Sequence, residues 1–197
     1  MTVAVVDYNA GNVRSVLFAL ERIGHAGILT SNAAQLRGAD KVIFPGVGEA
    51  NTTMRYLRET GLDQVIKSLT QPVLGVCLGM QLLCTHSEEN DTDCLGIIPQ
   101  RVRRFRPADR TLKVPHMGWN TLTEARAPLF DPAEAGREHF YFVHSYYVEP
   151  GPHTVATCDY VLPFSAALQK DNFHATQFHP EKSGSAGEGV LRRFLGV

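Results

Sequence analysis

Short apolar runs rich in valine and isoleucine alternate with helix-like patterns through the first half of the chain. The expected strands are TVAVVD (2–7), AGILT (26–30), KVIFPG (41–46) and PVLGVC (72–77). The expected helices cover residues 13–24, 49–69 and 80–87. This alternation predicts βα units joined into a mostly parallel sheet. Because the runs are apolar on both faces, we expect helices on both sides of the sheet, as in doubly wound α/β folds.

The second half of the chain, from about Leu95, changes to strand-like segments separated by many turns. These segments are IIPQRVRRF (97–105), LKVPHMGWN (112–120), HFYFVHSYYV (139–148) and HTVATCDY (153–160), and a last helix follows over EGVLRRFLG (188–196). The pattern predicts an antiparallel extension of the first sheet. No internal repeat or linker divides the sequence, so we expect a single domain over residues 1–197.

Composition and charge exclude several classes of protein. The chain has 197 residues, of which 44% are hydrophobic and 20% charged, an ordinary globular composition. A formal net charge of -1 offers no attraction for nucleic acid or an anionic membrane, so the basic run at 101–106 and the acidic run at 87–93 are expected to be solvated. The N-terminal apolar run has no basic leader and is interrupted by Asp7, so we expect no signal peptide, no membrane span and a cytoplasmic protein.

The stretch LGVCLGMQLL (74–83) places Cys77 between two glycines, where a predicted strand meets a predicted helix. Gly-x-Cys-x-Gly in that position has the form of a nucleophile elbow, a tight turn that exposes the nucleophile. The N-terminus of the helix would also favour the reactive thiolate. The alternative is a core cysteine at a glycine-rich packing contact. The other cysteines are expected to be reduced and packed, and no Cys-x-x-Cys pair points to a metal site.

A cysteine nucleophile needs a base, and the sequence FHPEKS (178–183) offers one. Pro180 fixes one backbone angle between His179 and Glu181, so the imidazole and the carboxylate could lie side by side. A carboxylate at one ring nitrogen orients the imidazole and leaves the other nitrogen free to serve the nucleophile. His-x-Glu alone is a weak signal, and only the fold could bring it to Cys77.

Together, Gly75–Gln81 (Gly-x-Cys-x-Gly-x-Gln) and the His-Pro-Glu of residues 179–181 resemble the motifs of the class I, triad-type glutamine amidotransferases. The resemblance covers nearly the whole chain and implies the flavodoxin-like fold of that family. The stretches at 7–16, 44–50 and 115–120 look most like the histidine-pathway branch, the glutaminase subunits of imidazole glycerol phosphate synthase.

The sequence PGVG at 45–48 departs from the Pro-Gly-Pro-Gly or Gly-Gly stretch of many relatives, which favours the histidine branch. The resemblance implies that Cys77 attacks the side-chain amide of glutamine, while His179 protonates the departing ammonia and then activates water. Two N–H groups would stabilise the oxyanion. Leu78 would supply one, and Val47 the other after a peptide flip that its two neighbouring glycines permit.

Contacts to the substrate are also implied by the resemblance. The expected substrate-binding residues are Gly46, Gly48, Gln81, Ser145 and Tyr146. Gln81 and the Ser145-Tyr146 pair would hold the amino-acid end of glutamine. Alternatively, these three are ordinary polar residues at a strand end or in a first helical turn. No cofactor is implied.

A separate acceptor subunit is implied, because the glutaminase fold uses almost every element and leaves no room for a synthase domain. The resemblance names a heterodimer with a (β/α)8-barrel cyclase, to which ammonia would pass without release. The interface candidates are Asn12, Met117, Trp119 and Lys182. Alternatively, Met117 and Trp119 fill the core beneath the site.

Two other functions stay open at this point. The chain could serve another synthase, such as one that makes pyridoxal phosphate or aminodeoxychorismate. It could also be a non-catalytic flavodoxin-like binding module in which Cys77 is structural.

Overall fold

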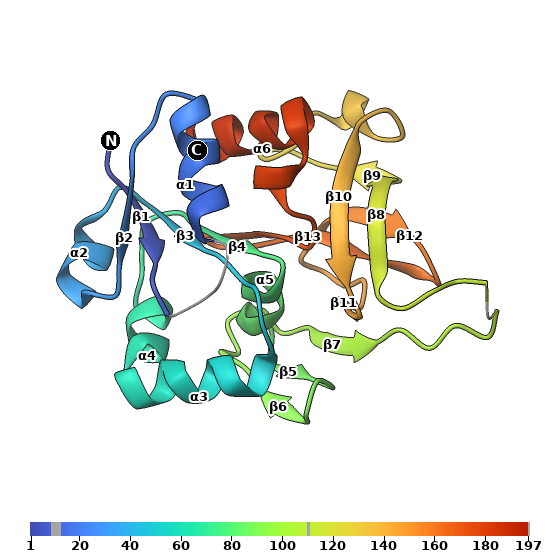
Figure 1. Cartoon of the computed structure of the whole chain (residues 1–197), viewed down its shortest axis with the longest axis horizontal. Coiled ribbons are helices and arrows are strands. Elements are labelled where there is room, and N and C mark those ends of the chain that lie inside the picture. The colour runs from blue at the N-terminus through green and yellow to red at the C-terminus, as the bar shows by residue number, and fades with distance from the viewer. Residues whose placement is uncertain (9–12, 110, 197) are drawn as a thin grey trace.

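A mixed sheet runs through the whole molecule in the computed structural model, which describes residues 1–8, 13–109 and 111–196 (Figure 1). Its strands are β1 (Val3–Val6), β2 (Gly27–Thr30), β3 (Lys41–Phe44), β4 (Val73–Val76), β5 (His86–Ser87), β6 (Thr92–Asp93), β7 (Arg101–Arg104), β9 (Glu124–Ala125), β11 (Tyr146–Val148), β12 (Thr154–Asp159), β13 (Pro163–Lys170) and β14 (Phe173–Thr176). The main order is β2-β1-β3-β4-β14-β13-β11-β7-β5-β6, and β12 and β9 attach beside β13. Strands β8 (His116–Thr121) and β10 (His139–His144) form a separate antiparallel pair.

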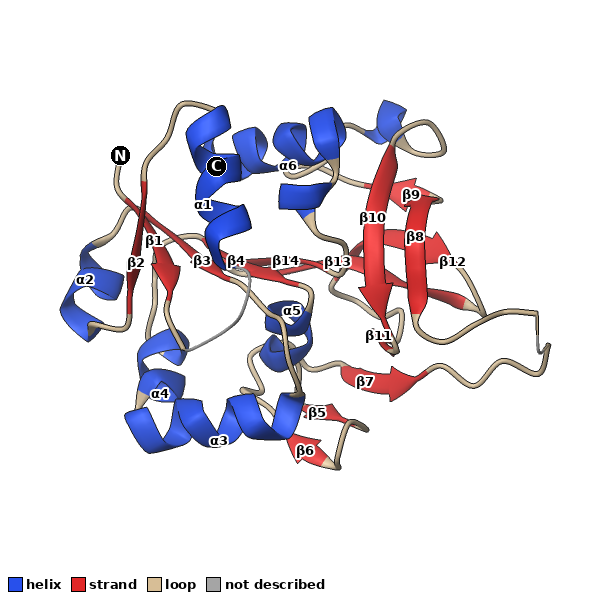
Figure 2. Ribbon diagram, viewed as in Figure 1, coloured by secondary structure: helices blue, strands red, loops and turns tan. Residues whose placement is uncertain are grey.

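Helices cover both faces of the parallel part of the sheet (Figure 2). They are α1 (Val13–Arg22), α2 (Ala33–Gly38), α3 (Ala50–Thr60), α4 (Leu62–Lys67), α5 (Leu78–Leu83) and α6 (Gly184–Gly196), with 3-10 turns η1 (Pro132–Glu134) and η2 (Pro180–Lys182). Alternate residues of β1 point into different cores: Val3 and Val5 pack with α1 and α6, whereas Ala4 and Val6 pack with α2 to α5. This two-sided burial confirms the predicted doubly wound α/β fold with an antiparallel extension.

Several boundaries differ from the expectation. The helix expected over 49–69 is two helices, because Gly61 adopts a left-handed φ of 72° between α3 and α4. The helix expected over 80–87 begins earlier, at Leu78, and ends at Leu83, so that His86 already belongs to strand β5. The segment 26–30 is a strand, but it lies at the sheet edge with its middle residues exposed.

The most important feature that the pattern did not predict is the place of β14 in the sheet. This strand pairs in parallel with β4, in a register that sets Thr176 beside Val76. It therefore sits in the middle of the sheet, next to the strand that leads to Cys77. Within the described ranges, no helix is long and apolar enough to cross a bilayer.

Candidate active site

Cys77 occupies a sharp turn between β4 and α5. Its backbone has φ 53° and ψ -108°, a conformation that residues with a Cβ rarely adopt. The residue is the N-cap of α5, so the first helical turn begins directly after it. The backbone is therefore that of a nucleophile elbow, and its strained residue is the cysteine itself rather than a flanking glycine.

The neighbouring glycines are needed for close packing of one backbone on another. A Cβ on Gly79 would lie 2.2 Å from the Phe44 carbonyl oxygen, and one on Gly46 would lie 2.1 Å from the Gly79 nitrogen. A Cβ on Gly75 would meet the Leu83 side chain at 2.9 Å. These approaches press the PGVG loop, residues 45–48, against the elbow. Gly46 and Gly79 thus allow the PGVG loop to pack against the elbow, while the sharp turn itself is made at Cys77.

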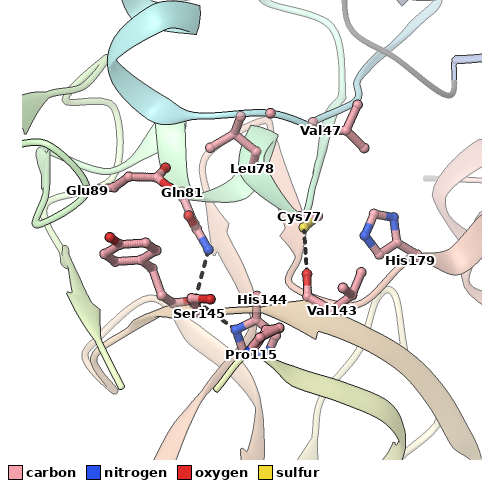
Figure 3. Close-up of a pocket in the computed structure, with 13 residues that line it drawn as sticks. Val47, Cys77, Leu78, Gln81, Glu89, Pro115, Val143, His144, Ser145 and His179 are labelled. Atoms are coloured by element: carbon pink, nitrogen blue, oxygen red, sulfur yellow. Dashed lines mark hydrogen bonds between the residues drawn. The ribbon is translucent and has the colours of Figure 1, made fainter. Parts of the chain in front are cut away.

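His179 reaches Cys77 because β14 runs beside β4. The chain leaving β14 passes the elbow at Gln177, and the His179 ring lies beside the sulfur on the same side of the pocket (Figure 3). The imidazole Nδ1 lies 2.8 Å from Glu181 Oε1, and both side chains are buried. The backbone N–H of His179 donates to the Tyr141 carbonyl at 2.9 Å, which holds the backbone from which the ring projects. Cysteine, histidine and glutamate therefore form a contiguous row.

The charge state of His179 follows from its two neighbours. Burial by itself lowers the pKa of this imidazole, but its electrostatic and hydrogen-bonding interactions with Cys77, and then with Glu181, raise the pKa to about 10. At neutral pH the ring is therefore an imidazolium that can donate from both nitrogens. The ring is thus placed to exchange a proton with a group that reacts at the Cys77 sulfur.

A pocket of about 360 Å³ opens in front of Cys77. It is lined by Gly46, Val47, Gly48, Cys77, Leu78, Gln81, Glu89, Pro115, Val143, His144, Ser145, Tyr146 and His179. All the residues expected to bind substrate or the oxyanion are in this lining, together with the cysteine and the histidine. Glu181 is buried behind His179, in the place of a group that orients the imidazole.

Gln81 is held by the protein at its nitrogen. Its Nε2 donates to the Tyr146 carbonyl at 3.0 Å and to Gln177 Oε1 at 2.9 Å. Both amide hydrogens are therefore used, and the acceptor oxygen Oε1 is available to a ligand. This geometry suits an ammonium group or another donor on a bound molecule.

Glu89 is a pocket residue that the sequence did not identify, because it falls in the acidic run expected to be a solvated loop. Its Oε2 accepts the N–H of Ala50 at 2.8 Å, and burial raises the pKa of this carboxyl. Figure 3 shows it at the far side of the pocket from Cys77, beyond Gln81. A carboxylate there can pair with a bound ammonium group. No spacing rule singles out one glutamate of such a run, since only the fold brings it to the pocket.

The PGVG loop is anchored at both ends. Tyr8 is buried, and its hydroxyl donates to the Pro45 carbonyl at 2.6 Å. At the other end, Glu49 caps α3 and accepts a hydrogen bond from Asn90 at 2.8 Å. Gly48 has a φ of 120°, which only glycine adopts readily. The loop is thus held at Pro45 and at Glu49, on either side of Val47.

The expected interface residues on β8 are exposed. Met117 is 64% exposed and Trp119 is 56% exposed, so neither fills the core beneath the site. Trp119 contacts Tyr141 edge to face at 5.8 Å between ring centres, and Lys182 lies over the Tyr141 ring at 5.9 Å. Met117 and Trp119 of β8, Tyr141 of β10 and Lys182 of η2 form one outer patch. Asn12, the remaining candidate, lies outside the described residues.

Comparisons with known proteins agree with one another. The family model described as glutamine amidotransferase class-I matches residues 4–196. The imidazole glycerol phosphate synthase subunit HisH of Bacteroides fragilis is 58% identical over 195 residues, covering 99% of both chains. The subunit of the same name from Bacteroides thetaiotaomicron is 59% identical with the same coverage.

Solved structures show the same fold at low sequence identity. A glutamine amidotransferase structure superposes with a TM-score of 0.76 and 20% identity, covering 100% of this chain and 98% of that one. A glutamine amidotransferase of Thermotoga maritima gives a TM-score of 0.67 and 15% identity, covering 99% of this chain and 96% of that one.

Proposed function

The chain belongs to the class-I glutamine amidotransferase family, and we propose that it hydrolyses glutamine with a triad of Cys77, His179 and Glu181. It is the glutaminase subunit of an imidazole glycerol phosphate synthase, as its identity of 58% to relatives of that name over the whole chain supports. The observation that carries the triad is the row of cysteine, imidazolium and buried carboxylate at the head of the pocket. We further propose that residues 1–197 form one glutamine amidotransferase domain.

The reaction would begin with attack of the Cys77 thiolate on the side-chain carbonyl carbon of glutamine. A carbon–sulfur bond forms, and the carbonyl becomes an oxyanion. As the oxyanion collapses, the carbon–nitrogen bond breaks and His179 gives its proton to the departing ammonia. The neutral imidazole then takes a proton from water, which attacks the thioester and releases glutamate. Glu181 keeps the ring oriented throughout and stabilises its charged form.

Two backbone donors are proposed for the oxyanion. The Leu78 N–H follows the nucleophile in the first turn of α5, and Val47 lies on the same side of the pocket as Leu78 (Figure 3). The peptide before Val47 would flip to present its N–H, which the glycines on both sides and the two anchored ends of the loop support.

For the amino-acid end of glutamine, we propose the side of the pocket away from the sulfur. The Gln81 oxygen and the Glu89 carboxylate would receive the α-ammonium group. The turn at Ser145 and Tyr146 would face the α-carboxylate. With the amino-acid end held there, the side-chain carbonyl carbon of glutamine would lie near Cys77, because Cys77, Gln81 and Glu89 line the same pocket.

The acceptor is proposed to be a (β/α)8-barrel cyclase subunit that docks on the outer patch of Met117, Trp119, Tyr141 and Lys182. An exposed tryptophan and methionine beside a lysine provide the apolar anchors and the charged rim of a protein interface. Such docking would let ammonia pass directly to its acceptor, before water protonates it to unreactive ammonium.

The test of the nucleophile is Cys77→Ser in the complex with the acceptor subunit. We expect glutamine-dependent turnover to vanish while turnover with added ammonium salt continues, because the acceptor needs only ammonia. Cys158→Ser is the matched control, since Cys158 is buried on β12 and lies outside the pocket lining. Glutamine-dependent turnover in the Cys77→Ser complex would show that another group is the nucleophile.

A further inference from the structure

Gln177 is a wholly buried glutamine whose side-chain amide touches the active site at both ends. Its Nε2 donates to the Cys77 sulfur at 3.7 Å, and its Oε1 accepts from Gln81 Nε2 at 2.9 Å. One amide therefore lies between the reacting sulfur and a side chain of the substrate pocket. The mechanism described above makes no use of it.

The orientation of this amide is fixed by its neighbours. The Tyr146 carbonyl can only accept, so the group of Gln81 that faces it at 3.0 Å must be the NH₂. The second hydrogen of that NH₂ then points at Gln177, which must present its oxygen there. The NH₂ of Gln177 is left to face the Cys77 sulfur. The donor at the sulfur thus follows from hydrogen-bond chemistry.

The same row of groups continues away from the pocket. The Tyr146 carbonyl also accepts from His144 Nδ1 at 2.7 Å, and His144 Nε2 lies 3.1 Å from His116 Nδ1. Burial lowers the pKa of His144 to about 3 and that of His116 to about 4, so both rings are neutral and each donates once. The Tyr146 carbonyl, which accepts from Gln81, is therefore itself held in place by the hydrogen bonds of His144 and His116.

We propose that Gln177 is a positioning residue of the reaction, a buried amide that hydrogen-bonds the Cys77 sulfur and fixes Gln81 against the substrate. This inference rests on the proposed function, in which the Cys77 sulfur is the nucleophile and Gln81 contacts the substrate. An N–H directed at the sulfur stabilises the thiolate without consuming a proton. The link to Gln81 sets the distance between the nucleophile and the bound amino-acid end.

The first experiment measures alkylation of Cys77 by iodoacetamide between pH 5 and pH 9, with the modified residue identified by mass. It compares the wild-type chain with Gln177→Met, which keeps the volume and removes the donor. At pH 7 we expect alkylation to slow by about tenfold, the effect of losing a hydrogen bond to a charged group. The half-maximal pH should move upward, and a profile that overlays wild type would overturn the proposal.

Gln100→Met is the matched control, because Gln100 is also buried and its Nε2 donates to the Glu149 carbonyl at 2.7 Å, outside the pocket lining. Its alkylation profile should match wild type. If Gln177→Met does not fold, Gln177→Glu keeps the shape and replaces the NH₂ with a carboxyl oxygen. Its profile should also move upward, and an unshifted profile in the folded Gln177→Glu chain would overturn the proposal.

The second experiment tests the link to Gln81 through glutamate release. Gln177→Met should lower kcat and raise KM, whereas Gln81→Met should mainly raise KM. The KM increase of the double variant should be smaller than the product of the single effects, because each variant already frees the same contact. A double variant whose KM increase equals the product of the two single increases would overturn the bridging role of Gln177. Alkylation needs no turnover, so its result stands apart from the Cys77→Ser test of the reaction.

Discussion

At the scale of single residues, the site depends on which group carries the charge. His179 is held as an imidazolium between a sulfur and a carboxylate, and its pKa of about 10 follows from those two partners. The cysteine and the His-Pro-Glu motif were readable from the sequence because each has a local signature. Glu89 and Gln177 were not, since neither has a spacing relation to Cys77 and both arrive from separate elements.

The two acid–base partners should respond differently to isosteric replacement. We expect His179→Asn to lose nearly all glutamate release, because no other described group beside Cys77 in the pocket lining can pass a proton to ammonia. Glu181→Gln should fold normally and lose less, since the carboxylate orients the ring and takes no proton. The measurement is kcat beside a thermal melt. Equal and total loss from Glu181→Gln with an unchanged melt would contradict this division of roles.

At the scale of elements, the sheet order makes the site. The strands that alternate with helices could be predicted from their apolar runs, and so could the elbow at the end of β4. The insertion of β14 beside β4 could not, because its four residues carry a histidine and a threonine and show no distinctive period. That pairing brings together residues about a hundred positions apart, which no local pattern encodes.

The β8–β10 pair should make the fold sensitive to acid. His116 and His144 are buried with pKa values of about 4 and about 3, whereas an unfolded histidine titrates near 6.5. Between these values the unfolded chain binds protons that the folded chain does not, so stability falls as the pH drops below about 6.5. At pH 5 the loss is about 2 kcal/mol for each histidine.

Denaturant unfolding at pH 7.5 and pH 5 measures this loss. Between these two pH values, the free energy of unfolding of His116→Gln should fall by about 2 kcal/mol less than that of wild type. The reason is that one of the two titrating groups is gone. His139→Gln, at an exposed position of the same strand pair, is the matched control. An equal drop in wild type and His116→Gln would contradict the assignment of a buried neutral ring.

At the scale of the whole molecule, the β8–β10 pair borders the pocket and also carries most of the outer patch. Pro115, His144 and Ser145 face the pocket, while Met117 and Trp119 face outward on β8. A partner on the patch would therefore press on the strands that border the substrate. The resemblance pointed to Met117, Trp119 and Lys182 of this patch, whereas Tyr141 and the exposure of the patch could be learned only from the fold.

We expect the isolated chain to release glutamate slowly and the loaded cyclase subunit to raise the rate. Loss of one oxyanion donor costs roughly a hundred- to a thousand-fold, and that factor is the stimulation expected when the Val47 N–H turns inward. Val47→Pro removes the N–H and should abolish the stimulation without loss of partner binding, whereas Val47→Ala keeps it. Equal rates with and without the partner would reject the gate and leave the triad in place.

The left-handed backbone of Cys77 also affects the stability of the fold. A conformation of this kind costs about 1–3 kcal/mol for any residue with a Cβ, and glycine would adopt it without that cost. Cys77→Gly would relieve this strain, but it would also remove a buried side chain and the nucleophile itself. The strain at Cys77 is therefore a cost of placing the nucleophile at this turn, and the cysteine there serves the reaction rather than the stability of the fold.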